Sequence, residues 1–339
     1  MNKRPRMTLG RAMALLACGL PVLAAGQTPS RIAAAGDYTP PRTAYGHPDL
    51  QGFWTNATYT PLERPDDVAE AFYTPEELAA RLARAAANES AQTEPGTVPD
   101  VHYDFTQFGL DRSQSTFVQD LRTSLIVAPE DGKIPPMTAE GEQRNAARAE
   151  AQRRLGERWD SAQANQLDDR CLIMRGSGPP MMDAGYNANY QIVQTPQHVM
   201  ILVEMIHDVR LIPLDGRAQP HANVRQWMGT SRGRWDGDTL VVETTNFNGK
   251  NPFRGSSEHM RVIERFTRVA DDEIMYSFTI DDPATWTRPW TAELPMKATF
   301  GPLFEHACHE GNYGLYNTLV GARLEEARAA AEAEQGEQN

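Results

Sequence analysis

Histidine and carboxylate side chains recur where short apolar segments of this chain end. One group follows the apolar run 199–203, where Glu204, His207 and Asp208 precede Arg210. Because histidine titrates near neutral pH, His207 could act as a general base that Asp208 or Glu204 holds in place. A solvated turn with a surface ion pair would show the same residue types. The pattern therefore predicts either an acid–base site or an ordinary exposed turn.

Aromatic and arginine residues come together in two further segments. Arg225 lies between His221 and Trp227, and an aromatic ring beside a guanidinium group suits a planar or anionic organic ligand. The alternative is that the indole fills the protein core. A second segment places Arg288 between two tryptophans, Trp286 and Trp290. That segment is expected either to cover a ligand or to seal one end of the fold.

Charged residues also precede and enter a later apolar segment. Glu258, His259 and Arg261 come just before it, and Glu264 lies on the same side as Val262. A carboxylate on an apolar face is expected to be either a buried partner of an arginine or a functional acid with a raised pKa.

The segment around Cys308 contains two histidines, His306 and His309, and the neighbouring Glu310. These residue types can bind a metal, but the His-Glu-x-x-His helix pattern of zinc peptidases is absent. A disulfide at Cys308 would also remove its sulfur as a ligand. We therefore predict no cofactor and no metal, with His309 and Glu310 as an alternative acid–base pair.

Several classes of function lack support in the sequence. The net charge is −12 over 339 residues, and no basic face for nucleic acid or for an anionic membrane can be assembled. A Gly-x-Ser-x-Gly elbow, a phosphate-binding glycine loop and a dinucleotide fingerprint are all missing. Hydrolases of the α/β type and nucleotide-dependent enzymes are therefore disfavoured.

The first residues predict export. Lys3, Arg4 and Arg6 precede a short apolar run, and small residues end it near residue 26. We interpret residues 1–26 as a signal peptide; lipidation at Cys18 is the alternative. In an oxidising compartment the remaining cysteines, Cys171 and Cys308, are expected to form a disulfide, although two buried thiols would fit the same sequence. The expected location is periplasmic or secreted, with no membrane contact beyond the cleaved peptide.

The elements that position these residues are predicted to be mainly β. Asp236-Gly237 favours a tight hairpin turn, and after it Leu240, Val242 and Thr244 are expected to point one way and Thr239, Val241, Glu243 and Thr245 the other. Short strands with frequent turns argue for an antiparallel meander that closes into a β-barrel. The expected strands are 121–128, 190–194, 199–204, 209–214, 224–228, 231–235, 239–245, 260–269, 273–280 and 290–299. Peripheral helices are expected at 74–88, 138–159 and 316–335. Residues 27–169 would form a lead-in, a first strand and packed helices, 170–313 the barrel core, and 314–339 a helix and tail.

Four motifs resemble a large family of exported, mostly uncharacterised bacterial proteins. They are Pro48–Trp54, Gly233–Phe247, Thr285–Trp290 and Cys308–Asn312. The Gly52-Phe53-Trp54 element also resembles the first strand of lipocalins and other calycins, in which the tryptophan plugs the closed end of a barrel. The resemblance implies export and a lipocalin-like β-barrel, and it implies no activity.

Three functions are compatible with the sequence. The first is an enzyme that acts on a small aromatic or apolar molecule by cofactor-free acid–base chemistry of the lyase, isomerase or hydrolase type. Its catalytic candidates are His207, Glu204, Arg210, His221, Glu258, His259 and His309, and its substrate-binding candidates are Trp227, Arg225, Arg261, Trp286, Arg288 and Trp290. The second is a periplasmic carrier of such a molecule. The third is an envelope interaction protein with a filled barrel. A homodimer is a further expectation.

Overall fold

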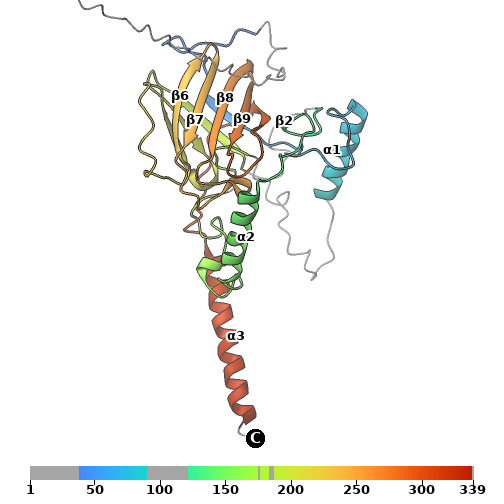
Figure 1. Ribbon diagram of the computed structural model, residues 1–339, viewed down its shortest axis with the longest axis vertical. Helices are drawn as coiled ribbons and strands as arrows, with labels where there is room; N and C mark the ends of the chain where they lie inside the picture. The colour runs from blue at the N-terminus through green and yellow to red at the C-terminus, as the bar shows by residue number, and fades with distance from the viewer. Residues whose placement is uncertain (1–37, 90–120, 175, 183–186, 338–339) are drawn as a thin grey trace, which may run out of the picture.

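The computed structural model describes residues 38–89, 121–174, 176–182 and 187–337 (Figure 1). The predicted signal peptide lies outside these residues. Three α-helices are described: α1 (Pro75–Glu89), α2 (Ala139–Arg153) and α3 (Tyr313–Glu337). The strands are β1 (Gly52–Thr55), β2 (Ile126–Ala128), β3 (Asn189–Gln194), β4 (His198–Val203), β5 (Val209–Pro213), β6 (Thr230–Asp236), β7 (Thr239–Thr245), β8 (Arg261–Ala270), β9 (Glu273–Asp281) and β10 (Trp290–Ala298).

These strands form one antiparallel sheet that curves into a nearly closed barrel (Figure 1). The order around it is β5-β4-β3-β1-β10-β9-β8-β7-β6, and β2 pairs with β10 beside this path. Within β1, Trp54 lies opposite Tyr190 of β3 and Ala298 of β10. The first strand therefore joins the two ends of the core segment. The prediction of a mainly β barrel with peripheral helices is confirmed.

Side chains close the remaining seam, between β5 and β6. A Cβ atom on Gly233 of β6 would lie 2.7 Å from Leu214 Cδ2 and 2.8 Å from Ile212 Cγ2, so glycine lets the two strands approach. The predicted hairpin follows directly, because Asp236 pairs with Thr239 and Gly237 has the positive φ of 59° that a tight turn requires. The barrel thus closes at a seam that has packing contacts in place of a backbone ladder.

The two ends of the barrel are covered by different parts of the chain. At one end the lead-in packs against the β6–β7 hairpin, where His47 stacks on Trp235 with ring centroids 4.9 Å apart. At the other end α2 packs against two connections: Thr138 donates to the carbonyl of Ala284, and Arg148 donates to that of Ser256. We call this second end the helix-side end; α2 and α3 lie below it in Figure 1.

Helix α1 begins with a capping box, while α2 is shorter than predicted. The Thr74 hydroxyl accepts from the Glu77 N–H, and the Glu77 carboxylate accepts from the Thr74 N–H. The prediction that the second helix continues to residue 159 is wrong, since α2 ends at Arg153. Gly156 follows with φ +84°, a left-handed conformation that stops a helix.

Two of the predicted strands also differ from the structure. Of residues 121–128 only Ile126–Ala128 form a strand, and Arg122 makes an isolated bridge to Phe72. Residues 224–228 form a turn in which only Gln226 bridges to Phe247. The first segment thus joins the ladder only through its last three residues, and the second makes a single bridge.

Aromatic and aliphatic side chains fill the barrel interior. The largest fully buried ones are Trp54, Trp286, Trp290, Tyr190, Tyr276, Phe266 and Phe278, together with Leu50, Leu125, Met181, Ile192 and Ile201. Phe266, Tyr276 and Phe278 form a chain of tilted rings with centroids 4.9 and 5.9 Å apart. Within the described ranges, no helix is both long and apolar enough to span a bilayer.

Candidate functional site

The connection from β4 to β5 at the helix-side end is short and conformationally strained. It is the segment Glu204–Asp208, in which Ile206 has φ 57° and His207 has φ 51°. Left-handed backbone is rare for residues other than glycine, and more so for a β-branched residue, and it costs about 1–3 kcal/mol per residue. Ile206 is buried and so anchors the turn, which fixes the direction of the exposed His207 side chain.

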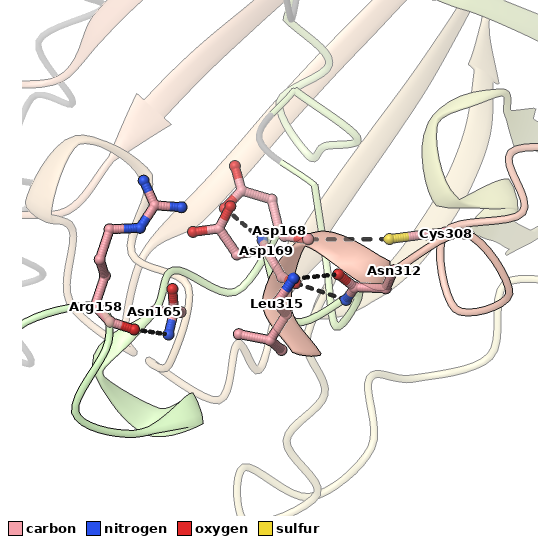
Figure 2. A pocket seen from close by; sticks show the side chains of 9 residues that line it. Arg158, Asn165, Asp168, Asp169, Cys308, Asn312 and Leu315 are labelled. Atoms are coloured by element: carbon pink, nitrogen blue, oxygen red, sulfur yellow. Dashed lines mark hydrogen bonds between the residues drawn. The ribbon is translucent and has the colours of Figure 1, made fainter. Parts of the chain in front are cut away.

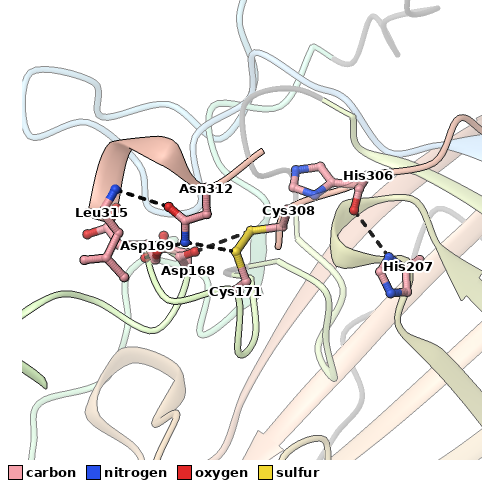
Figure 3. The surroundings of a disulfide bond; sticks show 8 residues. All are labelled: Asp168, Asp169, Cys171, His207, His306, Cys308, Asn312 and Leu315. Carbon is pink, nitrogen blue, oxygen red and sulfur yellow. Dashed lines mark hydrogen bonds between the residues drawn. A yellow bond between two sulfur atoms is a disulfide. The ribbon is translucent and has the colours of Figure 1, made fainter. Parts of the chain in front are cut away.

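A main-chain carbonyl orients the His207 ring. Its Nδ1 lies 3.3 Å from the carbonyl oxygen of His306, which belongs to the segment between β10 and α3 (Figure 3). Since a carbonyl only accepts hydrogen bonds, Nδ1 must be the protonated nitrogen of this contact. In the neutral ring the lone pair then lies on Nε2. The neutral imidazole is thereby held in the tautomer in which Nε2 can accept a proton.

Two further titratable groups at this place have polar atoms without a partner. Asp208 Oδ2 and His306 Nδ1 are both buried and make no hydrogen bond within the described part of the chain. Burial raises the pKa of the Asp208 carboxyl, and the nearby His207 ring only partly offsets this effect. Asp208 therefore keeps its proton to a higher pH than an ordinary aspartic acid.

Glu204 has a different partner from the one predicted. Its buried carboxylate accepts from Asn189 Nδ2 at 2.6 Å and from Asn187 Nδ2 at 3.4 Å. These bonds tie the end of β4 to the start of β3. Glu204 therefore shapes the connection, while the orientation of His207 comes from the His306 carbonyl.

The predicted disulfide is present and holds the His306 segment in place. Cys171 and Cys308 are bonded across 137 residues of sequence, with Cα atoms 5.7 Å apart. His306 lies two residues before this bond, and Figure 3 shows both beside His207. The disulfide thus fixes the carbonyl on which the His207 ring depends.

A cavity of about 260 Å³ is lined by Cys308 of the disulfide and by residues at the start of α3 (Figure 2). Asn312 is part of the cavity lining; its side chain donates to the Asp169 carbonyl at 2.8 Å and accepts from the Leu315 N–H at 3.3 Å. The lining is of mixed polarity and includes Arg158, Asn165, Asp168, Asp169, Asn312 and Leu315.

Arg210 lies inside the barrel, in a buried polar network. Its guanidinium group binds both carboxylate oxygens of Glu264, at 2.9 and 2.5 Å, and reaches Ser231 at 3.5 Å. Tyr276 donates to Glu264 at 2.9 Å and accepts from the Met181 N–H at 2.9 Å. Burial, and next the charge of Glu264, raise the pKa of Tyr276 well above its usual value. Glu264 is thus the buried partner of an arginine, one of its two predicted roles.

The tryptophans of the 285–290 segment belong to the core. Trp286 and Trp290 meet edge to face with centroids 5.7 Å apart, and both are almost fully buried. Phe253 stacks on Trp290 at 6.1 Å. The two indoles therefore seal the helix-side end, one of the two predicted roles, whereas Arg288 is exposed beside them.

The remaining candidates lie on the outer surface of the same end. Arg225 pairs with Glu258, whose carboxylate is 3.6 Å from His259 Nε2. Lys250 lies 5.9 Å above the half-buried Trp227 ring. His221 Nδ1 accepts from the Asn223 N–H, and His309 is exposed. Arg261 pairs with Glu243 and Asp281. Among the described residues, the hydrogen-bond partner of the His207 ring is the His306 carbonyl and not a member of this group.

A metal site finds no support in the described ranges, where no three His, Cys, Asp or Glu side chains are placed to hold an ion. Comparison with family models, with curated proteins and with solved structures gave no match to this chain.

Two residues of the site were not among the predicted site residues. Asp208 was considered only as a partner that orients His207, and His306 only as a metal ligand. The sequence signal for His306 was its place two residues before a predicted disulfide. The position of His306 in the sequence does not show that the disulfide would bring His306 next to the β4–β5 connection.

Proposed function

We propose that this protein is an exported enzyme that acts on a small aromatic or apolar organic molecule by cofactor-free acid–base chemistry. His207 is the proposed general base. The observation behind the assignment is its Nδ1 contact with the His306 carbonyl, which leaves Nε2 as the proton acceptor. His207 would remove a proton from the substrate through Nε2 and become an imidazolium whose charge the carbonyl stabilises.

Asp208 is the proposed acid partner. Burial raises the pKa of its carboxyl above that of an ordinary aspartic acid. A carboxyl that keeps its proton could donate it to a leaving group or to a carbon atom after His207 has taken the first proton. A base that takes a proton and an acid that returns one are what a lyase or isomerase step requires.

The surface next to the site favours an apolar substrate. Val209 and Leu211 point outward from β5, directly after Asp208, and are 52% and 58% exposed. Leu172, beside the disulfide, is also exposed. Exposed apolar side chains next to a site favour contact with an apolar molecule. The net charge of −12 further disfavours a strongly anionic substrate.

Export to an oxidising compartment, the periplasm or the exterior, belongs to the same proposal. It is supported by the Cys171–Cys308 disulfide, since such bonds persist mainly outside the cytosol. The basic and apolar pattern of residues 1–26 supports it independently. A carrier function, in which the barrel would hold the ligand, has less support because bulky aromatic side chains fill the interior.

A screen with many candidate substrates tests this function. The mature protein is incubated in D₂O with a library of small aromatic compounds, and mass spectrometry follows deuterium uptake and new products. We expect one compound class to exchange or react, and His207→Gln to remove that activity. His198→Gln is the matched control because His198 lies at the opposite end of the barrel, at the start of β4. Equal activity of the wild type and His207→Gln would contradict the assignment.

A further inference from the structure

Helix α3 leaves the body of the protein with an exposed apolar stripe along one side. It has 25 residues, and in Figure 1 it extends away from the barrel below α2. Arg323, near the middle of the helix, still contacts the body and donates to the carbonyls of Trp159 and Asp160. The stripe follows the helical repeat along the helix and consists of Tyr313, Tyr316, Val320, Leu324, Ala327 and Ala331.

The large residues of this stripe are strongly exposed. Tyr313, Tyr316 and Leu324 are 71%, 65% and 55% accessible. Gly321 lowers the intrinsic stability of the helix, since glycine is a poor helix former. A Cβ atom added at this position would meet no other atom within 4 Å. Most helical stability in proteins comes from packing of an apolar face. A helix of this composition is therefore expected to pack its stripe against another surface.

We propose that α3 pairs with α3 of a second copy of this chain in an antiparallel two-helix contact. The sizes of the side chains decide the orientation. An antiparallel register centred between Val320 and Leu324 places these two side chains against each other. The same register sets Tyr313 opposite Ala331 and Tyr316 opposite Ala327, bulky against small. A parallel pair would stack tyrosine on tyrosine and leave alanine facing alanine.

The charges of α3 favour the same arrangement. Glu332 and Glu334 lie near its C-terminus, and its last turn contains no basic residue, so these carboxylates meet the negative end of their own helix dipole. Its first turn contains no acidic residue. In an antiparallel pair the acidic end of one helix lies beside the first turn of the other, which has the positive end of the helix dipole and no acidic residue of its own. A two-fold contact of this kind closes on itself as a dimer.

The first test is the mass of the mature protein in solution, measured by light scattering and sedimentation at several concentrations. We expect a dimer that the double variant Val320→Glu/Leu324→Glu weakens by at least about tenfold. The matched control, Ala329→Glu/Ala333→Glu, adds the same charges at the same spacing on the opposite side of the helix. It should stay dimeric. A monomeric wild type, or a stripe variant that dimerises as well as the control, would overturn the proposal.

A second test measures the orientation and does not depend on weakening the helix. Tyr313→Cys and Ala331→Cys variants are mixed and oxidised mildly. An antiparallel pair predicts a cross-link between the two variants. It predicts none within Tyr313→Cys alone, because the two copies of position 313 are then about 27 Å apart along the axis. Cross-linking of Tyr313→Cys with itself, and not with Ala331→Cys, would contradict the antiparallel arrangement.

Discussion

Replacing Arg210 by methionine should destabilise the barrel more than the loss of any surface ion pair. Arg210 and Glu264 are both almost fully buried, and their bond links edge strand β5 to β8 across the seam. Removing one partner leaves an uncompensated charge in the interior, which typically costs about 3–5 kcal/mol. Tyr276, whose hydroxyl donates to Glu264, cannot neutralise that charge.

The size of the effect makes it easy to measure. For a domain of about 150–250 residues, 1 kcal/mol shifts Tm by about 2–4 °C, and the shift is smaller for a longer chain, so Arg210→Met should lower Tm by at most roughly 6–20 °C. The double variant Arg210→Met/Glu264→Leu removes both charges and should lose less stability than the two single variants together.

Urea unfolding followed by tryptophan fluorescence and circular dichroism gives the free energies of the whole cycle. Arg261→Met is the matched control, because Arg261 pairs with Glu243 in a half-exposed position on the same strand as Glu264. It should cost no more than about 1 kcal/mol. If Arg210→Met cost as little as Arg261→Met, the buried pair would not stabilise the contact between β5 and β8.

Further predictions concern the disulfide and the strained connection. The Cys171→Ser/Cys308→Ser variant should lose about 2–5 kcal/mol in urea unfolding and should also lose activity, because the His306 carbonyl is no longer fixed; full activity of a folded variant would contradict this. Asp208→Asn should be more stable than the wild type at neutral pH. Burial raises the pKa of Asp208 in the folded state, so the wild type gains stability as the pH falls through this raised pKa. The advantage of Asp208→Asn should therefore shrink over that range and vanish below about 3.9, the pKa of an unfolded aspartic acid. A Tm difference between the two proteins that does not change with pH would exclude burial of the charged carboxylate as the reason for the difference. His207→Gly should raise stability by about 1 kcal/mol, because glycine adopts φ 51° without strain; a lower Tm would show that the side chain itself supports the turn.

The barrel could be predicted because its signals are local. The Asp236-Gly237 turn predicts a hairpin, and the two-residue spacing of Leu240 and Val242 on one face of the following strand supports it within a few residues. The end of α2 was missed because the helical composition continues past Arg153, while the stop is a single glycine in a left-handed conformation.

The candidate site was predictable only in part, because it joins segments far apart in the sequence. His207 was found from residue type and its place between two strands. Its contact with His306 spans 99 residues and depends on the path of the segment after β10, which the sequence pattern does not show. The tryptophans at 286 and 290 show the same limit, since a sealing residue and a ligand-covering residue have the same sequence signature.

Chemical rescue of a His207 variant tests the central claim most directly. In His207→Gly the backbone keeps its left-handed turn, and the position of the imidazole, exposed in the wild type, is open to small molecules. With a substrate from the deuterium screen, we expect His207→Gly to be inactive and added imidazole to restore the rate in proportion to its neutral fraction. A folded His207→Gly protein that is fully active without imidazole, or that imidazole does not rescue at any pH, would contradict the role of His207 as the general base.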